Sequence, residues 1–379
     1  MTQVSLQRHR YAVAAAFFAQ GMVFISLTTR LPALQRIWKL DETGMSLLLL
    51  MMVLLSGAGS VLAETLAKRG QSSTLLRMGL GLIVLAVPTL VLAPVFAVFV
   101  LGLAGYGIAL GVVDAACNMQ AVAVEHRYER PILPSFHGAW TLGGAVGAAL
   151  ALALGLLPFE VTAAVVAVPL VVALAPFLER VGLPDLTDLP TVSWRPILLV
   201  GLAMVLFYMV DTAAFTWGPT YLDTVFSTPS QLVALATLPY LLASGTMRLA
   251  GDDLVRRFGP VPVLRFGTVV AVAALALVVL APSWPLAVLG FTLVGGGVAV
   301  VAPLSFSSAA RIAGEGTDDP ATRHARVDAV IGRFNQFNYV GALLGAVMTG
   351  LVGTGNLRIG FAVPMVLIVA LWPLARAFR

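Results

Sequence analysis

The sequence LAKRGQSSTLLRMG at Leu66–Gly79 returns 188 residues later in a second version, LVRRFGPVPVLRFG at Leu254–Gly267. Leucines, arginines and the final glycine coincide, and Lys68 stands where the second copy has Arg256. The offset is about half of the 379 residues. The sequence therefore predicts an internal duplication, in which each half of the chain is one structural repeat.

The composition excludes an ordinary soluble domain. Hydrophobic residues make up 59% of the chain, charged residues only 11%, and the mean hydropathy is +0.95. Soluble domains contain about 25% charged residues, so this chain has too few charges to cover a soluble surface. The net charge of +5 does not indicate a nucleic-acid partner, because the basic residues lie in short loops between apolar runs. The single cysteine, Cys117, excludes an intrachain disulfide.

The apolar runs predict an all-α integral membrane protein, because about 20 apolar residues suffice to cross the hydrocarbon core. We expect twelve transmembrane helices in two six-helix bundles, residues 1–178 and 196–379, joined by a cytoplasmic linker at 179–195. Each basic copy then lies between the second and third spans of its half. The expected spans are 11–35, 44–67, 74–93, 96–124, 134–157, 160–178, 196–222, 230–255, 260–281, 284–310, 327–352 and 357–377.

The distribution of basic residues predicts the orientation of these spans. Of the 23 Lys and Arg residues, 17 fall on the side of the N-terminus, four fall on the other side, and Arg248 and Arg333 are embedded. Lys and Arg concentrate in cytoplasmic loops. We therefore expect both termini in the cytoplasm and a multi-pass protein of the bacterial cytoplasmic (inner) membrane. The apolar run from Tyr11 is long and lacks a cleavage site, so it is expected to be a retained first span.

Two related bundles around a midplane site are typical of secondary transporters. By topology and duplication the whole chain resembles the major facilitator superfamily. The fourth-span sequence Asp114–Asn118 is similar to the acid-x-Ala-x-Asn signature of its fucose–proton symporter branch. TTRLPALQ at Thr28–Gln35 and LPSFHGAWTLGG at Leu133–Gly144 are similar to a related bacterial group that includes a rhizopine-transport membrane protein.

This resemblance implies how the protein works. In the fucose branch the fourth-span acid translocates protons, which assigns that role to Asp114. The branch has a second acid in the first span, where this chain has Thr28, and this departure argues against fucose itself. The basic loops correspond in position to the superfamily's gating motif, although the order of residues is degenerate. The expected gating residues are Glu64, Lys68, Arg69, Arg248, Asp252, Asp253, Arg256 and Arg257.

The residues themselves also single out Asp114. It lies eleven residues before Glu125, hence roughly 16 Å from the cytoplasmic boundary and near the middle of a ~30 Å core. A central Asp costs about 2.5–3.5 kcal/mol on insertion scales. Burial disfavours the charged form of a carboxyl group, so such a group can bind and release a proton when water access alternates. The alternative is a structural ion pair or a hydrogen bond between helices.

Further polar residues are candidates for coupling or gating. Asp211 is the main intramembrane acid of the second half, and we expect it to handle substrate or protons. His137 lies near the start of the fifth span and is a candidate proton relay. A hydrogen-bonded residue at the helix start is the alternative for His137. Arg248 and Asp252 are four residues apart on one helix and are expected to pair.

Candidates for solute binding are polar or aromatic residues within the spans. Asn118 shares a helix face with Asp114, so it either binds solute or positions the carboxylate. Arg30 lies toward the outer end of the first span, as an outer gate, a counter-charge or a snorkelling residue. Core packing explains the aromatic candidates equally well. The full set is Asn118, Arg30, Gln20, Tyr208, Trp217, Arg333, Asn335, Asn338 and Tyr339.

Gly143 with Gly147, and Gly341 with Gly345, form small-xxx-small pairs that permit close helix contact. The chain has no Gly-x-Ser-x-Gly, His-Glu-x-x-His or nucleotide-binding glycine loop, so we do not expect an enzyme.

The leading hypothesis is a proton-coupled transporter that takes up a small polar solute of sugar- or polyol-like chemistry. The alternatives are a proton-driven exporter of a drug or natural product, and a non-transporting receptor. We expect a monomer among membrane lipids, powered by the proton gradient, with no cofactor, metal or nucleic acid.

Overall fold

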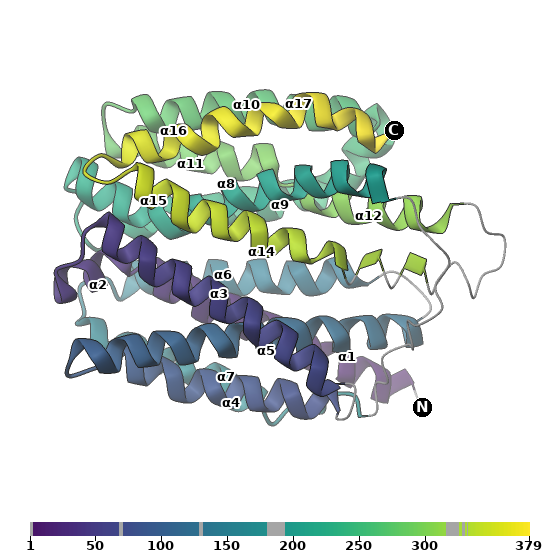
Figure 1. Cartoon of the computed structure of the whole chain (residues 1–379), viewed down its shortest axis with the longest axis horizontal. Coiled ribbons are helices and arrows are strands. Elements are labelled where there is room, and N and C mark those ends of the chain that lie inside the picture. The colour runs from purple at the N-terminus through teal and green to yellow at the C-terminus, as the bar shows by residue number, and fades with distance from the viewer. Residues whose placement is uncertain are drawn as a thin grey trace. The chain divides into compact units, whose positions relative to one another are not determined.

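The structure is a computed structural model (Figure 1). It describes residues 3–67, 71–128, 132–179, 194–315, 326–327, 330–331 and 333–379. Every regular element among these residues is a helix, and none of them forms a strand. The predicted all-α class is therefore confirmed.

Ten of the described helices are long and apolar enough to cross a membrane, and two shorter apolar helices cover Phe159–Val172 and Gln336–Val352. The number of twelve spans stays a prediction. The first half contains α1 (Gln3–Thr28), α2 (Leu31–Trp38), α3 (Glu42–Ala67), α4 (Ser72–Val91), α5 (Phe96–Tyr128), α6 (Leu133–Ala153), η1 (Phe159–Val166) and α7 (Ala167–Val172). The second half contains α8 (Trp194–Phe226), η2 (Val233–Ala236), α9 (Leu238–Phe258), α10 (Pro260–Leu280), α11 (Trp284–Val298), α12 (Val301–Gly314), α14 (Gln336–Leu343), η3 (Leu344–Met348), α15 (Thr349–Val352), α16 (Leu357–Leu367), η4 (Ile368–Ala370), α17 (Leu371–Leu374) and η5 (Ala375–Phe378).

The chain folds into two compact units. Unit 1 contains residues 1–183 and the short segment 229–234, and unit 2 contains residues 184–228 and 235–379. The segment 229–234 follows α8 in the chain yet packs with unit 1, which the sequence did not indicate. Most of the predicted linker, residues 180–193, lies outside the described residues. The predicted bundle boundaries at 178 and 196 therefore stay a prediction.

In both units, glycine residues allow pairs of helices to pack closely. On α6, a Cβ atom at Gly143 would come within 2.0 Å of the Phe18 carbonyl oxygen on α1. In unit 2, a Cβ atom at Gly345 would come within 2.3 Å of the Met209 carbonyl oxygen on α8. No side chain fits at either position. The predicted close contacts at the small-xxx-small pairs are therefore confirmed, and the two halves share them as a duplication would require.

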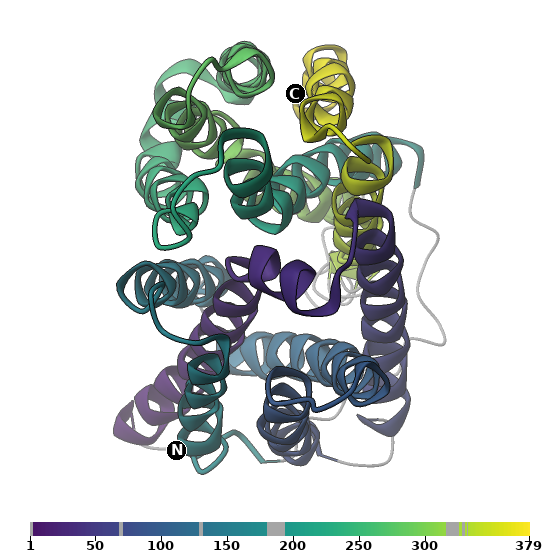
Figure 2. The same cartoon turned by 90° about the vertical axis from the view of Figure 1, so that its left-hand side faces the viewer.

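The first helix of unit 1 ends in a sharp turn. Thr29 donates its hydroxyl to the Ile25 carbonyl at 2.7 Å, and Pro32 lies in the first turn of α2, where a missing N–H costs nothing. Arg30 stands between α1 and α2 as the N-cap of α2. In Figure 2, α2 lies at the end of unit 1 that faces the viewer, the end remote from the N-terminus.

Candidate functional site

Asp114 and Asn118 lie one turn apart on α5, and both side chains are half-buried. The Asn118 amide donates to the Asp114 carbonyl oxygen at 2.9 Å and approaches Oδ1 of the same residue at 3.5 Å. The predicted shared face is therefore present. The Asn118 amide therefore lies beside the Asp114 carboxylate on the same helix.

Gln20 on α1 is buried, at 4% exposure, and its Oε1 atom has no hydrogen-bond partner among the described residues. A buried acceptor without a partner costs about 1–3 kcal/mol. Such a group is an available acceptor for a hydroxyl or amide of a bound solute. Gln20 therefore remains a candidate on geometry as well as on sequence.

Unit 2 contains a buried carboxylate with two partners. Asp211 on α8 is buried, and the hydroxyl of Tyr240 on α9 donates a hydrogen bond to its Oδ1 atom. The positive charge of Arg248 also acts on Asp211, and its guanidinium lies 5.9 Å from the centre of the Phe207 ring. Sequence reasoning paired Arg248 with Asp252, whose side chain is not described. The structure adds Asp211 as a charged neighbour of Arg248.

Tyr240 was missed by the sequence analysis. It lies 29 residues from Asp211 and on a different helix, so no spacing rule connects them. The available signal in the sequence was a tyrosine within an apolar run, directly after Pro239 at the start of α9. That signal alone does not distinguish it from core aromatic residues.

The polar residues of the predicted eleventh span do not all lie in one environment. Asn335, Asn338 and Tyr339 are half-buried, with Asn335 at the N-terminus of α14. Arg333 is exposed, and its guanidinium lies 6.0 Å from the centre of the Trp194 ring. Its neighbour is thus the start of α8.

The two aromatic candidates on α8 differ. Tyr208 is half-buried and packs edge-on against Phe207, with ring centroids 4.9 Å apart. Trp217 is fully buried, and its indole N–H donates to the Ala346 carbonyl at 2.7 Å. Ala346 belongs to the π-helical turn η3, where altered backbone pairing frees a carbonyl. Because its only donor is used, Trp217 fits a packing role, and we do not include it in the proposed site.

Among the predicted gating residues, Arg248 is half-buried, and Glu64, Asp253, Arg256 and Arg257 are exposed. Arg256 donates to Asp253 at 2.6 Å, and Arg257 lies 5.2 Å from the centre of the Phe258 ring, all at the end of α9. Exposed pairs of this kind contribute about 0–1 kcal/mol. Glu64 is exposed on α3. Lys68, Arg69 and the side chain of Asp252 lie outside the described residues.

His137 lies in the first turns of α6, half-buried, with its ring edge-on to Phe17 at 5.4 Å between centroids. This contact ties α6 to α1. Among the described residues, no cluster of three or more His, Cys, Asp or Glu side chains could hold a metal ion.

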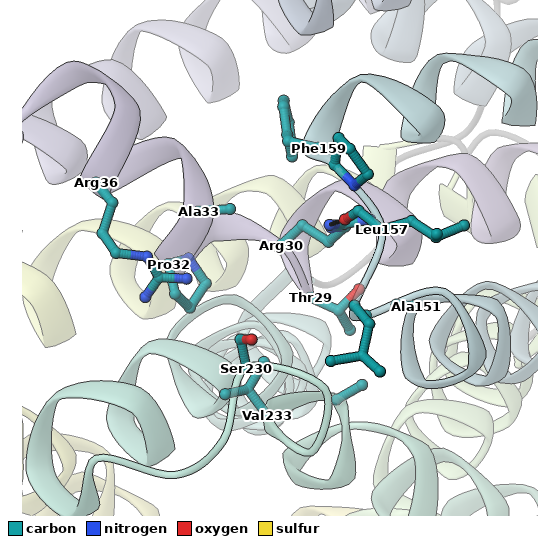
Figure 3. Close-up of a pocket in the computed structure, with 14 residues that line it drawn as sticks. Thr29, Arg30, Pro32, Ala33, Arg36, Ala151, Leu157, Phe159, Ser230 and Val233 are labelled. Carbon is teal, nitrogen blue, oxygen red and sulfur yellow. Dashed lines mark hydrogen bonds between the residues drawn. The ribbon is translucent and has the colours of Figure 1, made fainter.

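Arg30 lies at the end of unit 1 beside a cavity (Figure 3). Its Nη2 atom donates to the Leu157 carbonyl at 2.8 Å, and its guanidinium lies 5.7 Å from the centre of the Phe159 ring. Burial lowers the pKa of the Arg30 guanidinium, and the negative charge of Glu160 opposes this effect. Arginine stays charged under such shifts. Its contacts lie with the turn after α6, and none of them is with Asp114.

Comparisons with known proteins agree with this architecture. Residues 13–346 match the family model of the Major Facilitator Superfamily. The chain is 31% identical over 320 residues to an uncharacterized transporter, y4wD, of Sinorhizobium fredii, which covers 79% of this chain and 81% of that protein. Solved structures of similar fold include a mutant form of the nucleoside transporter NupG, with TM-score 0.72, 15% identity and coverage of 97% of this chain and 98% of that one. They also include the E. coli fucose:proton symporter FucP, with TM-score 0.59, 16% identity and the same coverage of both chains.

At 15–16% identity the two solved structures show a shared fold and no more. The family model covers most of the chain, and the rhizobial relative exceeds 30% identity over most of its length. The resemblance predicted from the duplicated loops and from Asp114–Asn118 is thereby confirmed. The chain belongs to the major facilitator superfamily of multi-pass membrane transporters.

Proposed function

We propose that this transporter couples solute movement to protons, and that it takes up a small polar organic solute of sugar- or polyol-like chemistry. In this proposal, two six-helix bundles expose a central site to each side of the bacterial inner membrane in turn, which is transport by alternating access. Family membership makes the protein a transporter and not an enzyme. The proposal adds the coupling ion, the solute class and the direction.

The half-buried carboxylate of Asp114 carries this proposal. It lies half-buried within a long apolar helix, one turn before Asn118. An ionised carboxylate at this depth is costly, and protonation removes that cost. A proton can then bias the transporter only if Asp114 binds it with different affinity in the inward- and outward-facing states.

Unit 2 offers a second carboxylate in a different setting. Asp211 is buried, accepts a hydrogen bond from Tyr240 and lies within the field of Arg248. Burial disfavours the charged form of this carboxylate, and the hydrogen bond from Tyr240 and the charge of Arg248 oppose that effect only in part. Asp211 is therefore a second candidate for the proton-binding group, besides Asp114.

The solute class rests on the kind of polar groups present. In unit 1, Gln20 has a buried acceptor without a partner, and Asn118 is half-buried. In unit 2, Asn335 and Asn338 are half-buried. Amide side chains both donate and accept, which suits a solute rich in hydroxyl groups. Two proteins of the same fold are named for hydroxyl-rich solutes, fucose and nucleosides.

The test is proton-driven transport in proteoliposomes by the wild type and the Asp114→Asn variant. With an acidic exterior, the wild type should accumulate a member of a panel of radiolabelled sugars and polyols. Asp114→Asn should lose this accumulation yet still exchange solute across the membrane in the absence of a gradient. Glu315→Gln, which removes an exposed carboxylate paired with Arg311, is the control and should transport normally.

Each other outcome has a meaning. Undiminished accumulation by Asp114→Asn would reject the coupling role of Asp114. Accumulation driven by an acidic lumen instead of an acidic exterior would identify a proton-driven exporter. Solute binding without flux under any gradient would identify a receptor.

A further inference from the structure

The cavity beside Arg30 has the size of a small-molecule site. Its volume is about 360 Å³. Pockets that bind small molecules measure about 300–1,000 Å³. All fourteen residues that line it belong to unit 1, including three from the segment 229–234. The cavity is thus a feature of one compact unit.

The charge of its wall has one sign. Arg30 and Arg36 line the cavity, and none of the described residues that line it is an acid. Most of the remaining wall is apolar, with Ala33, Leu157 and Val233 among the lining residues that Figure 3 shows. A cavity lined by both cationic and apolar side chains suits a molecule with an anionic group and a carbon skeleton.

Arg30 is held in place before any ligand binds. One of its five N–H groups donates to the Leu157 carbonyl, and the guanidinium lies against the Phe159 ring. The group is also partly buried, so it has lost part of its hydration. Loss of freedom on binding is a main cost of affinity, and a guanidinium that is already fixed reduces that cost.

Figure 3 shows Arg36 reaching from α2 toward Pro32 and the segment that carries Ser230. Arg36 is exposed, and it adds a second positive charge to the wall. Ser230 adds a hydroxyl that can donate to an oxyanion or accept from a sugar hydroxyl.

We propose that this cavity binds the oxyanion group of a small organic acid, such as the carboxylate of a sugar acid, against the guanidinium groups of Arg30 and Arg36. The inference rests on the proposed function, because it names the class of solute that the transporter receives. It places this solute at the end of unit 1 remote from the N-terminus, at a site separate from Asp114.

The chain provides a matched control for the structural role of the Arg30 side chain. Arg358 in unit 2 also donates to a carbonyl, that of Val279 at 2.8 Å, and also lies against a ring, 5.1 Å from the centre of Phe226. It does not line the cavity. Removing either guanidinium breaks the same kinds of contact, so a difference between the two variants reports on ligand binding.

The experiment measures binding of D-glucuronate and D-glucose by calorimetry, with protein in phosphatidylcholine nanodiscs. The two sugars differ in one carboxylate. We expect the wild type and Arg358→Gln to bind glucuronate and to bind glucose at least tenfold more weakly. Arg30→Gln and Arg36→Gln should bind glucuronate about tenfold to a hundredfold more weakly, as expected for loss of a charged hydrogen bond. Arg36→Gln removes an exposed residue, so its result stands even if Arg30→Gln folds poorly.

Three results would overturn the inference. The first is equal affinity of the wild type for both sugars, or no binding of glucuronate. The second is equal glucuronate affinity in Arg30→Gln, Arg36→Gln and Arg358→Gln. The third is loss of glucuronate binding when phosphatidylglycerol replaces part of the phosphatidylcholine, which would assign the cavity to lipid headgroups. This binding assay needs no proton gradient, so failure of proton coupling in Asp114→Asn flux assays would leave it intact.

Discussion

The hydroxyl of Tyr240 donates a hydrogen bond to the Asp211 carboxylate, and this contact joins α9 to α8 inside unit 2. Both side chains are buried. A hydrogen bond to a charged group contributes about 1.5–3 kcal/mol, and one between neutral groups about 0.5–1.5. The contact therefore connects the stability of unit 2 to the charge state of one carboxylate.

Tyr240→Phe should lower the thermal stability of the purified protein more than Tyr221→Phe does. The hydroxyl of Tyr221 donates to the Val278 carbonyl, a neutral acceptor, so its loss leaves no charge without its partner. We expect a cost of about 2–3 kcal/mol for the first change and about 1 for the second. Melting curves in one detergent would compare them. Equal losses would show that the Asp211 contact is no stronger than a neutral one.

A double-mutant cycle tests the same contact directly. In an Asp211→Asn background the carboxylate is gone, so Tyr240→Phe should cost about 1 kcal/mol less than it does in the wild type. The melting temperatures of the four proteins give this difference. Strictly additive effects would mean that the two side chains do not interact in the purified protein.

Gln120 should be a major stabilising residue of unit 1. It is fully buried on α5, and its amide donates to Ser72 at 2.8 Å and to the Leu178 carbonyl at 2.9 Å, while its oxygen accepts from the Leu178 amide at 2.9 Å. Gln120→Leu keeps the volume but leaves both backbone groups of Leu178 unpaired. We expect a loss of about 2–4 kcal/mol, seen as a lower melting temperature.

The control for this change is Gln336→Leu, which removes an exposed amide at the start of α14. Surface substitutions of this kind usually change stability by no more than about 0.5 kcal/mol. If Gln120→Leu behaved like Gln336→Leu, the three hydrogen bonds would not hold the end of unit 1 in place. Proteolysis near Leu178 should increase in Gln120→Leu, because the backbone there loses its anchor.

Glu125, near the end of α5, caps the N-terminus of α6. Its Oε2 atom accepts from the backbone amides of Ile132 at 2.6 Å and Leu133 at 2.7 Å. A negative charge at a helix N-terminus is stabilising. Glu125→Gln should cost about 1 kcal/mol and Glu125→Ala about 2, measured by thermal unfolding. An unchanged melting temperature in Glu125→Ala would contradict this capping role.

The sequence could predict relationships within one helix and not those between helices. Asp114 and Asn118 are four residues apart, and helical periodicity alone places them together. The same rule paired Arg248 with Asp252, although the charge of Arg248 also acts on Asp211 on another helix. Tyr240 was missed for the same reason. A spacing rule carries no information on which helix packs against which.

The glycine pairs were predictable for a different reason. A residue without a side chain in an apolar span has few roles other than close contact, so Gly143 and Gly345 could be assigned from their spacing. The cavity at Arg30 could not, because its wall combines the turn after α1 with the turn after α6 and the segment 229–234. Those segments are far apart in the sequence, and only the fold brings them together.

Two glycines on α6 give an internal test of this close packing. A Cβ atom at Gly143 would meet the Phe18 carbonyl oxygen at 2.0 Å, whereas one at Gly138 would meet nothing within 4 Å. Gly143→Ala should therefore push α6 away from α1 and lower the melting temperature by several degrees. Gly138→Ala should leave it unchanged or raise it slightly, because alanine favours the helix by about 1 kcal/mol. Equal effects of the two changes would show that α1 and α6 do not pack this closely in the bilayer.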